Sequence, residues 1–382
     1  MSIVKFGDVV KEVKGKVDRD NNPYDYYIAG EHMDSEDLHL HRRGSFATDD
    51  VGPAFIREFL PGQILYGSRR TYLKKVAVAD FAGVTANTTF VLETKDENVL
   101  RQRLIPFIML SEGFTEWSIG KSKGSTNPYV LFSDLADYEF NLPDIETQDK
   151  LVDLLWSMDD AVVAYKNVIE KTDELVKSQF IEMADGAPVV PLSDICSSYG
   201  RGRTPKYVEE SKVHVLNQAC IYWDGFKLEN VKYQDESKFK EINSLIKGDV
   251  LLNSTGTGTL GRTRVFDIED EYTYMTDSYV TILRPDISKI LPVVLQYYFY
   301  DDNNQMELYR LCVFGSTNQA ELSKEALGRM KVPVIEMEKQ KRFVGLVNQS
   351  DKSKFELKDT LENVNAMRIK IVEDNFYKAG KE

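Results

Sequence analysis

Basic side chains in loop-forming surroundings are the residues whose types and spacing best fit a chemical task. They cluster at residues 69–75 (RRTYLKK), 121–123 (KSK), 201–206 (RGRTPK) and 262–264 (RTR). In loops, Lys and Arg can neutralise phosphates, and Arg can reach guanine edges. A solvated loop charge explains any single residue equally well. The clusters recur, however, at broadly corresponding places of an internal repeat, which favours a phosphate-bearing polymer as the ligand.

Glycine-rich segments beside these clusters resemble nucleotide-binding motifs, but each lacks an essential part. Residues 256–261 (GTGTLG) match the GxGxxG pattern of dinucleotide sites and follow a predicted strand. Such a site needs a helix next, because the pyrophosphate lies at that helix's N-terminus. The following residues, RTRVFDIEDEYTY, alternate as in a strand and favour a glycine-rich hairpin. Gly120-Lys121-Ser122 resembles the end of a P-loop, but Thr115 occupies the place of the required earlier glycine.

No constellation of catalytic side chains can be argued from the sequence. Residues 22–24 and 127–129 (both NPY) are similar to the adenine-pocket motif of amino-methyltransferases but lack its second proline, so turn formation explains them. His32, His39 and His41 lie in an acidic polar segment, which is expected to be a loop with solvated histidines and no metal ligands. We therefore expect no catalytic, cofactor or metal site.

Length and composition indicate a globular protein of more than one domain. At 382 residues, two domains of about 150 residues with connectors are expected. No apolar run approaches the roughly 20 residues that span a bilayer, and the N-terminus lacks the apolar core of a signal peptide, so the cytoplasm and no membrane partner are expected. Cys196, Cys220 and Cys312 form no CxxC and are expected to be ordinary buried thiols.

An internal repeat organises the chain. Matching segments lie about 190 residues apart, and the offset between them rises slowly along the sequence, as loop insertions would produce. The chain is therefore expected to be a duplication in which a globule and a helix alternate. The main matches are residues 61–68 (PGQILYGS) with 247–254 (KGDVLLNS), the segment GSTN at 124–127 and 315–318, and Gln148 with Gln340.

A long helix is expected after each globule. Residues 142–183 carry apolar side chains at steps of four and three, the spacing of a helix that packs along a partner. Residues 334–376 repeat this plan, but Ser350 and Lys354 interrupt the pattern, so part of that face is expected to meet another subunit or solvent. The side chains expected to pair the helices are Leu151, Leu155, Met158, Val162, Tyr165, Ile169 and Val176 on the first, and Phe343, Val347, Leu357, Leu361 and Val364 on the second.

Over essentially its whole length the chain resembles the specificity (S) subunit of a type I restriction–modification system. The most specific features are the GSTN segments and the helix starts LPDIETQDKLVDLL and VIEMEKQKRFVGLV. The resemblance implies an α+β fold with two mixed α/β target-recognition domains, separated by two long antiparallel coiled-coil helices in a pseudo-twofold internal duplication. The implied boundaries are 1–141 and 188–333 for the recognition domains, 142–187 for the central helix and 334–382 for the C-terminal helix.

The resemblance also implies a function. Each recognition domain would read one half of a split double-stranded DNA site, while the paired helices set the unread spacer and dock two methyltransferase (M) subunits. Restriction (R) subunits would complete a complex with adenine-DNA methyltransferase and ATP-dependent endonuclease activities. The chain alone is expected to be non-catalytic, with S-adenosylmethionine, ATP and Mg²⁺ bound by the partner subunits.

Within this frame, phosphate contacts would set the register on DNA and a few loop side chains would read bases. The residues expected to contact DNA are Arg69, Arg70, Lys74, Lys121 and Lys123 in the first domain, and Arg201, Arg203, Asn253, Arg262 and Arg264 in the second.

Two other functional classes stay open at this point. A two-lobed coiled-coil adaptor that never touches DNA would suit the net charge of −13, although local patches decide binding more than net charge does. A stand-alone methyltransferase is the enzyme alternative, and it would have to bind S-adenosylmethionine.

Overall fold

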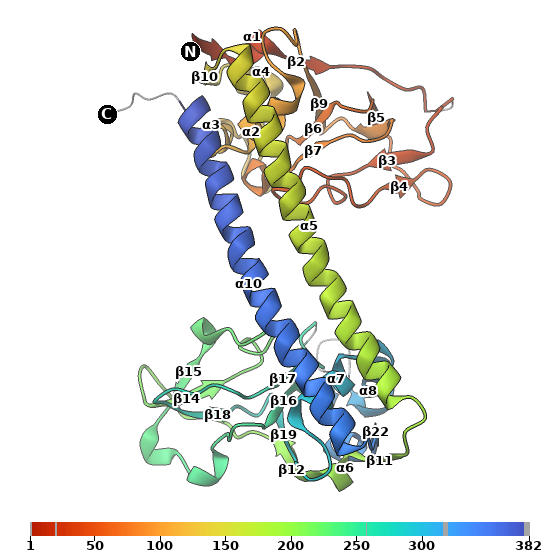
Figure 1. The fold of residues 1–382 in the computed structure, drawn as a ribbon, viewed down its shortest axis with the longest axis vertical. Helices are drawn as coiled ribbons and strands as arrows, with labels where there is room; N and C mark the ends of the chain where they lie inside the picture. Colours follow the sequence, from red (N-terminus) through yellow and green to blue (C-terminus); the bar gives the residue numbers. More distant parts are fainter. Residues whose placement is uncertain (1, 20, 257, 316–319, 378–382) are drawn as a thin grey trace. The chain divides into compact units, whose positions relative to one another are not determined.

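The computed structural model describes residues 2–19, 21–256, 258–315 and 320–377. The chain divides into two compact units: unit 1 contains Met1–Lys166 and Lys358–Glu382, and unit 2 contains Asn167–Leu357. The helices α5 (Ile145–Ala184) and α10 (Met337–Phe376), each 40 residues long, contribute to both units (Figure 1). The boundaries implied by the sequence place each long helix outside the recognition domains and stay a prediction. Among the described residues, no helix is long and apolar enough to cross a membrane.

Unit 1 is a mixed α/β structure with short strands. One sheet has the strand order β2-β9-β6-β7, another has the order β4-β3-β8-β5, and β1 pairs with β10. Runs rich in β-branched and apolar residues at 64–66, 75–79 and 88–92, which predict strands, form β6, β7 and β9, and residues 101–109 contribute to the short helices η2 and α2. The elements before α5 are β1 (Ser2–Lys5), α1 (Phe6–Val9), β2 (Val10–Val13), β3 (Tyr26–Ile28), β4 (Gly44–Ser45), β5 (Phe55–Phe59), β6 (Ile64–Gly67), η1 (Thr71–Leu73), β7 (Val76–Val78), β8 (Gly83–Ala86), β9 (Thr89–Thr94), η2 (Gln102–Leu104), α2 (Ile105–Leu110), α3 (Glu112–Lys121), α4 (Phe132–Ala136) and β10 (Glu139–Leu142).

Unit 2 has the same kind of architecture. Its sheets have the orders β12-β19-β16-β17 and β13-β15-β14-β18, with the pairs β11-β22 and β20-β21 beside them. Its elements between the long helices are β11 (Val189–Pro191), α6 (Leu192–Ile195), β12 (Cys196–Arg201), β13 (Tyr207–Val208), β14 (Val213–Leu216), η3 (Leu228–Asn230), β15 (Lys232–Gln234), η4 (Glu236–Lys238), η5 (Glu241–Asn243), β16 (Val250–Asn253), β17 (Thr263–Val265), β18 (Thr273–Thr276), β19 (Val280–Pro285), α7 (Pro292–Tyr300), α8 (Asp302–Cys312), β20 (Val313–Phe314), β21 (Glu321–Leu322), α9 (Lys324–Arg329) and β22 (Lys331–Pro333).

The strand registers of the two units match. In unit 1, Ile64 of β6 pairs with Leu92 of β9, and in unit 2, Val250 of β16 pairs with Leu283 of β19. The turn before each of these strands uses a glycine with positive φ, Gly62 at 86° and Gly248 at 94°, a conformation that glycine adopts without steric cost. The sequence repeat is therefore a repeat of backbone hydrogen bonding.

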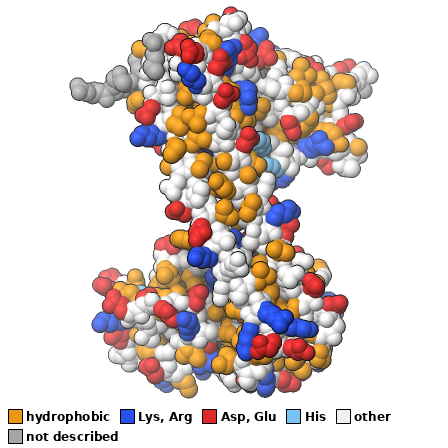
Figure 2. Space-filling view, in the orientation of Figure 1, with side chains coloured by type: hydrophobic (Ala, Val, Ile, Leu, Met, Phe, Trp, Pro, Cys, Tyr) orange, Lys and Arg blue, Asp and Glu red, His pale blue; other side chains and the backbone are white. Residues whose placement is uncertain are grey.

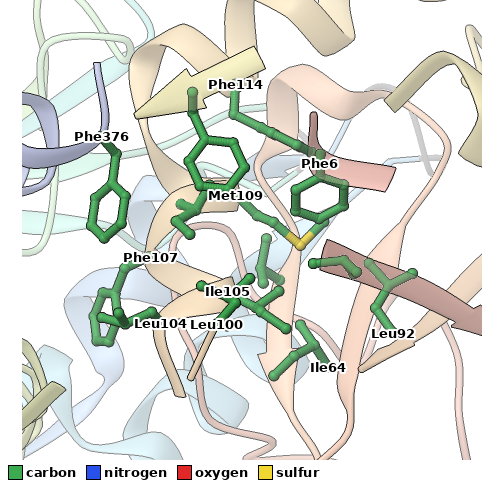
Figure 3. Close-up of a cluster of buried hydrophobic side chains, with 14 of the residues drawn as sticks. Phe6, Ile64, Leu92, Leu100, Leu104, Ile105, Phe107, Met109, Phe114 and Phe376 are labelled. Carbon is green, nitrogen blue, oxygen red and sulfur yellow. The ribbon is translucent and has the colours of Figure 1, made fainter. Parts of the chain in front are cut away.

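The core of unit 1 forms where the sheet β2-β9-β6-β7 meets α2, α3 and the long helices. Phe6, Met109 and Phe114 lie at its centre (Figure 3), and the ring centroids of Phe6 and Phe114 are 5.1 Å apart. Val372 and Phe376 of α10 join the same cluster. Burial of such side chains contributes about 1.5–3 kcal/mol each, so α10 is fixed to unit 1 by its last turns.

Within each unit, α5 and α10 contact one another. In unit 2, the ring centroids of Phe180 and Phe343 are 6.0 Å apart, and Lys354 Nζ lies 2.6 Å from Asp173. The residue numbers of the contacting pairs rise along α5 from 173 to 180 and fall along α10 from 354 to 343, so the two helices are antiparallel in unit 2. In unit 1, Asp159 accepts a hydrogen bond of 2.7 Å from Arg368. All the side chains expected to pair the helices are buried or half-buried.

The structure corrects the expectation for Ser350 and Lys354. Ser350 is buried, and the Lys354 side chain is only 16% exposed, with its ammonium beside Asp173 and Asp351. Lys354 therefore stays inside the helix contact as an ion pair, and Ser350 is enclosed there, so neither residue turns that face to solvent. An ion pair of this kind favours one register over others.

Two loop expectations are also settled. Lys121 was expected in a loop with the rest of its basic cluster, but it is the last residue of α3, whose N-terminus is capped by Ser111 accepting from the Phe114 N–H. The segment after Gly261 was expected to be a strand, and β17 confirms it by pairing with β16. The second GSTN segment, apart from Gly315, lies outside the described residues.

Candidate nucleic-acid interface

In unit 2, the ends of neighbouring strands place polar residues at one edge of the sheets. β14 and β18 are parallel and end in register, so Asn217 and Asp277, which follow them, lie at the same edge. β16 ends at Asn253, which pairs with Val280 just after the Asp277 loop. We call this region the strand-end edge of unit 2.

Arg203 is held at this edge by its backbone. Its N–H donates to the Thr276 carbonyl (3.2 Å), and the N–H of Gly202 donates to the Val280 carbonyl (2.9 Å). A Cβ on residue 202 would lie 2.2 Å from Thr276 Oγ1, so only glycine permits this close approach. The Arg203 side chain is exposed and can extend toward a ligand.

Asn253 and Arg262 also reach the edge, in different ways. Asn253 is fully buried and its Nδ2 donates to the Gln218 carbonyl (3.0 Å), which makes it a support for the loop and not a free reader. The guanidinium of Arg262 lies 4.6 Å from the centroid of the Tyr222 ring, and Lys227 Nζ lies 4.1 Å from the same ring. Stacking of this kind orients a cation without neutralising it.

Arg201 and Arg264 are engaged elsewhere. Arg201 Nη2 lies 3.1 Å from Glu321 and ties β12 to β21. Arg264 is half-buried, its Nε is enclosed, and its charge interacts with Tyr300 and Asp351. Neither guanidinium is presented freely at the strand-end edge.

In unit 1, Arg69 and Arg70 occupy the place equivalent to the end of β16. Ser68 N–H donates to the Thr88 carbonyl (3.0 Å), and Arg69 forms an antiparallel bridge with Tyr129. Arg70 has a φ of 51°, a left-handed conformation that is uncommon outside glycine. Both arginines are exposed.

The lysines expected to contact DNA in unit 1 all have neighbours. Such surface contacts are weak, so each ammonium can exchange its neighbour for a phosphate. The partners are Glu36 for Lys74 (2.7 Å), the Trp117 ring for Lys121 (4.6 Å to the centroid) and Asp134 for Lys123 (3.0 Å).

The two edges share their supporting hydrogen bonds. Ser68 N–H donates to Thr88 O, and its carbonyl accepts from Val130 N–H at 2.9 Å. Ser254 N–H donates to Tyr279 O at 2.9 Å, and its carbonyl accepts from Leu322 N–H at 3.0 Å. The duplication therefore extends from the sheets to the loops that carry the expected DNA contacts.

Sequence reasoning missed the polar residues after β14 and β18. Asn217, Gln218 and Asp277, with the exposed rings of Tyr207 and Tyr279, line a pocket of about 610 Å³. Their only sequence signal is a polar residue directly after an apolar strand, as in VHVLNQ and YTYMTD. That pattern occurs at most strand ends, so it singles out none of them.

The histidine segment of unit 1 forms an ion-pair network and lines a cavity of about 210 Å³. His39 Nε2 lies 2.8 Å from Asp159, and this hydrogen bond raises the pKa of His39. Asp37 lies 3.1 Å from Lys166 and 3.4 Å from His41. The expectation of a solvated His39 was therefore wrong. Among the described residues, no group of three or more His, Cys, Asp or Glu side chains has the geometry of a metal site.

The net charge of −13 means that acidic side chains outnumber basic ones in the chain. On the face shown in Figure 2, acidic and basic side chains are interspersed over both units. Binding of a polyanion must therefore depend on local cations such as Arg69, Arg70 and Arg203. Two units with matching registers and matching loop supports define a protein built from two copies of one mixed α/β domain.

The comparison with known families agrees with this class. The chain matches the family described as "Type I restriction modification DNA specificity domain" over residues 2–172 and again over residues 185–365. It belongs to this family, and the two matches follow the two halves of the duplication.

Curated relatives match one part of the chain. The specificity subunit of the type I restriction enzyme HindI from Haemophilus influenzae is 22% identical over 179 residues, which cover 46% of this chain and 38% of the relative. That of EcoDI from Escherichia coli is 25% identical over 171 residues, 45% of this chain and 36% of the relative. The aligned part is thus less than half of each relative's length.

Solved structures share the fold over nearly the whole chain. One match is a chain from a structure that describes complex assembly and conformational transition of the type I R-M system. Its TM-score is 0.58 and its sequence identity is 16%, and the alignment covers 98% of this chain and 97% of that chain. The type I restriction–modification S subunit from M. genitalium matches with a TM-score of 0.56 and 16% identity. The alignment covers 99% of this chain and 96% of that chain. At this identity the likeness concerns the fold.

Proposed function

We propose that this chain is the sequence-specific DNA-recognition subunit of a type I restriction–modification complex. Each unit reads one half of a bipartite DNA site, and the chain itself catalyses no reaction. The observation that carries the proposal is the duplicated loop support: the same hydrogen bonds hold Ser68, directly before Arg69 and Arg70, in one unit and Ser254, before the loop that leads to Arg262, in the other.

The exposure of each side chain decides whether it can contact DNA or supports the loop. Exposed Arg69, Arg70 and Arg203 are available for phosphates or base edges. Arg262 is oriented by the Tyr222 ring, whereas buried Asn253 supports the loop backbone. Different loops on a common scaffold suit two units that read different half-sites.

The long helices are proposed to form an antiparallel coiled coil that sets the spacer between the half-sites. An α-helix of 40 residues extends about 60 Å at about 1.5 Å per residue. A pseudo-twofold relation between the units would present the edges to two successive parts of one duplex.

The helices are also proposed to dock two methyltransferase subunits. Large apolar side chains remain exposed on them, such as Val168 and Leu175 on α5 and Phe355 and Met367 on α10, and exposed apolar groups of this kind often mark protein interfaces. Restriction subunits would join the assembly in the cytoplasm. S-adenosylmethionine, ATP and Mg²⁺ belong to those partners in this proposal.

A mobility-shift assay with randomised duplexes tests the proposal. The chain co-expressed with its methyltransferase subunits should retain a subset of sequences, and Arg203→Ala should weaken that binding by about 1–3 kcal/mol. Arg310→Ala is the matched control, because Arg310 is exposed on α8 and contacts Glu307. Binding with no sequence preference would contradict sequence-specific recognition, and no binding at all would favour the adaptor alternative.

A further inference from the structure

The pocket beside the strand-end edge of unit 2 has the composition of a ligand site. Tyr207 of β13 and Tyr279 after β18 line it with rings that are 50% and 51% exposed. Asp277 lies between these elements and is only 3% exposed. Exposed aromatic rings around a buried charge are unusual for a protein surface without a ligand.

Asp277 is a buried carboxylate without a cationic partner in the part of the chain that the structure describes. Its Oδ1 accepts a hydrogen bond from the Tyr279 N–H at 2.9 Å. Burial raises the pKa of Asp277 to about 6. A buried charge costs stability unless it is paired or hydrogen-bonded, so this carboxylate is a poor choice for a purely structural position.

The neighbouring amides cannot offer the same acceptor. Asn217 Oδ1 accepts from the Ala219 N–H at 2.8 Å. Gln218 Oε1 accepts from the hydroxyl of Thr255 at 3.2 Å. The carboxylate of Asp277 is therefore a buried acceptor in the pocket with capacity for a ligand, whereas Glu209 and Glu229 line the pocket from exposed positions.

We propose that this pocket is a base-reading site of unit 2, in which Asp277 accepts a hydrogen bond from the exocyclic amino group of a cytosine or adenine. Aspartate accepts from the N4 amino group of cytosine in the major groove, and adenine presents its N6 amino group there. Tyr207 and Tyr279 would contact the same nucleotide through their rings. This inference rests on the proposed function and adds a residue that determines specificity.

The position of the pocket supports this role. Gly202 packs against the backbone of Thr276 and Asp277, which brings exposed Arg203 to the same loop. A cation for phosphate and an acceptor for a base edge are thus held on one piece of backbone. Positioning contacts and reading contacts are combined in this way at protein–DNA interfaces.

Asp277→Asn tests the proposal by replacing an acceptor with a donor of the same shape. The amide oxygen can keep the Tyr279 N–H, and the amide nitrogen would then face the pocket. In a selection from randomised duplexes by the complete assembly with its methyltransferase subunits, preference at one position should move from cytosine or adenine to guanine or thymine. The discrimination lost there should be about tenfold or more, while all other positions stay unchanged.

Glu271→Gln is the matched control, because Glu271 is exposed at the other end of β18, outside the pocket, and the variant loses the same charge. It should leave every base preference unchanged. Unaltered preferences in Asp277→Asn, an equal loss on all sequences, or the same shift in Glu271→Gln would overturn the proposal. Absence of any preference in the unaltered assembly would instead refute the proposed function, so the two failures are distinguishable.

Discussion

Gln148 and Gln340 make the same hydrogen bonds at the starts of α5 and α10. Gln148 Oε1 accepts from the Arg101 N–H at 3.0 Å, and Gln340 Oε1 accepts from the Leu291 N–H at 2.8 Å. Each side chain is fully buried. Gln148 Nε2 also donates to the carbonyls of Val99 and Pro143. Gln340 Nε2 donates in the same way to the carbonyls of Lys289 and Ile335. In each case the second acceptor lies five residues before the glutamine.

Replacing either glutamine with alanine should destabilise the protein, because buried backbone groups would lose their partners. We expect a loss of about 2–4 kcal/mol in the free energy of unfolding for Gln148→Ala and for Gln340→Ala, measured by urea denaturation. Gln179→Ala is the control, since Gln179 is exposed on α5 and contacts Glu182. A loss of unfolding free energy no greater than that of the control would contradict the stabilising role of these glutamine hydrogen bonds.

This glutamine pair also shows what a sequence can reveal. The offset of 192 predicted that Gln148 and Gln340 are equivalent, and the strand and helix patterns predicted several of the strands and both long helices. The sequence does not show which polar side chains meet across elements. Lys354 looked like an interruption because its partner, Asp173, lies 181 residues away. Asp277 carried no signal because the residues around it, such as Tyr207 and Asn217, come from segments that are distant in the sequence.

Among the residues expected to contact DNA, the structure separates free from engaged side chains. Arg69, Arg70 and Arg203 are exposed, whereas Arg201 is paired with Glu321. Spacing in a sequence places a residue in a loop, but the partner that neutralises its charge comes from a distant segment. Their roles in DNA binding stay predictions.

The contact between His39 and Asp159 predicts a pH dependence of stability. Because the hydrogen bond raises the folded-state pKa of His39 above its ordinary value of 6.5, the stabilisation is complete below that value. It is lost as the pH rises through the folded-state pKa. The difference in unfolding free energy between the unaltered chain and His39→Gln should therefore fall as the pH is raised above 6.5.

Asp159→Asn should remove the same pH dependence, because it takes away the partner of His39. Arg368 also contacts Asp159, so this variant is expected to be less stable at every pH. A His39→Gln difference that is constant with pH would contradict the assignment.

The buried carboxylate of Asp277 predicts that its replacement by asparagine stabilises the protein at high pH. Its folded-state pKa of about 6 lies above the ordinary 3.8, so the unaltered chain loses stability as the pH rises through about 6. Asp277→Asn should be more stable at pH 8 by up to about 3 kcal/mol, at about 1.4 kcal/mol per pKa unit. Denaturation curves should converge as the pH is lowered toward 4. Equal stability at pH 8 would contradict the buried charge.

The spacer hypothesis predicts the effect of lengthening both helices. Four residues inserted after Lys166 in α5 and after Leu357 in α10 add about 6 Å to each helix. The preferred spacer should change and both half-sites should stay the same, as measured by selection from randomised duplexes. Insertion of four residues at Gly186, in the loop after α5, is the control and should leave the spacer unchanged. A change in the bases read would refute the ruler role.

The central claim is that one chain reads two separate half-sites. The direct measurement is sequencing of the duplexes that the chain, co-expressed with its methyltransferase subunits, selects from a fully randomised pool. The account predicts two short fixed sequences separated by a spacer of constant length with no base preference. A single continuous motif, or no enrichment, would contradict it.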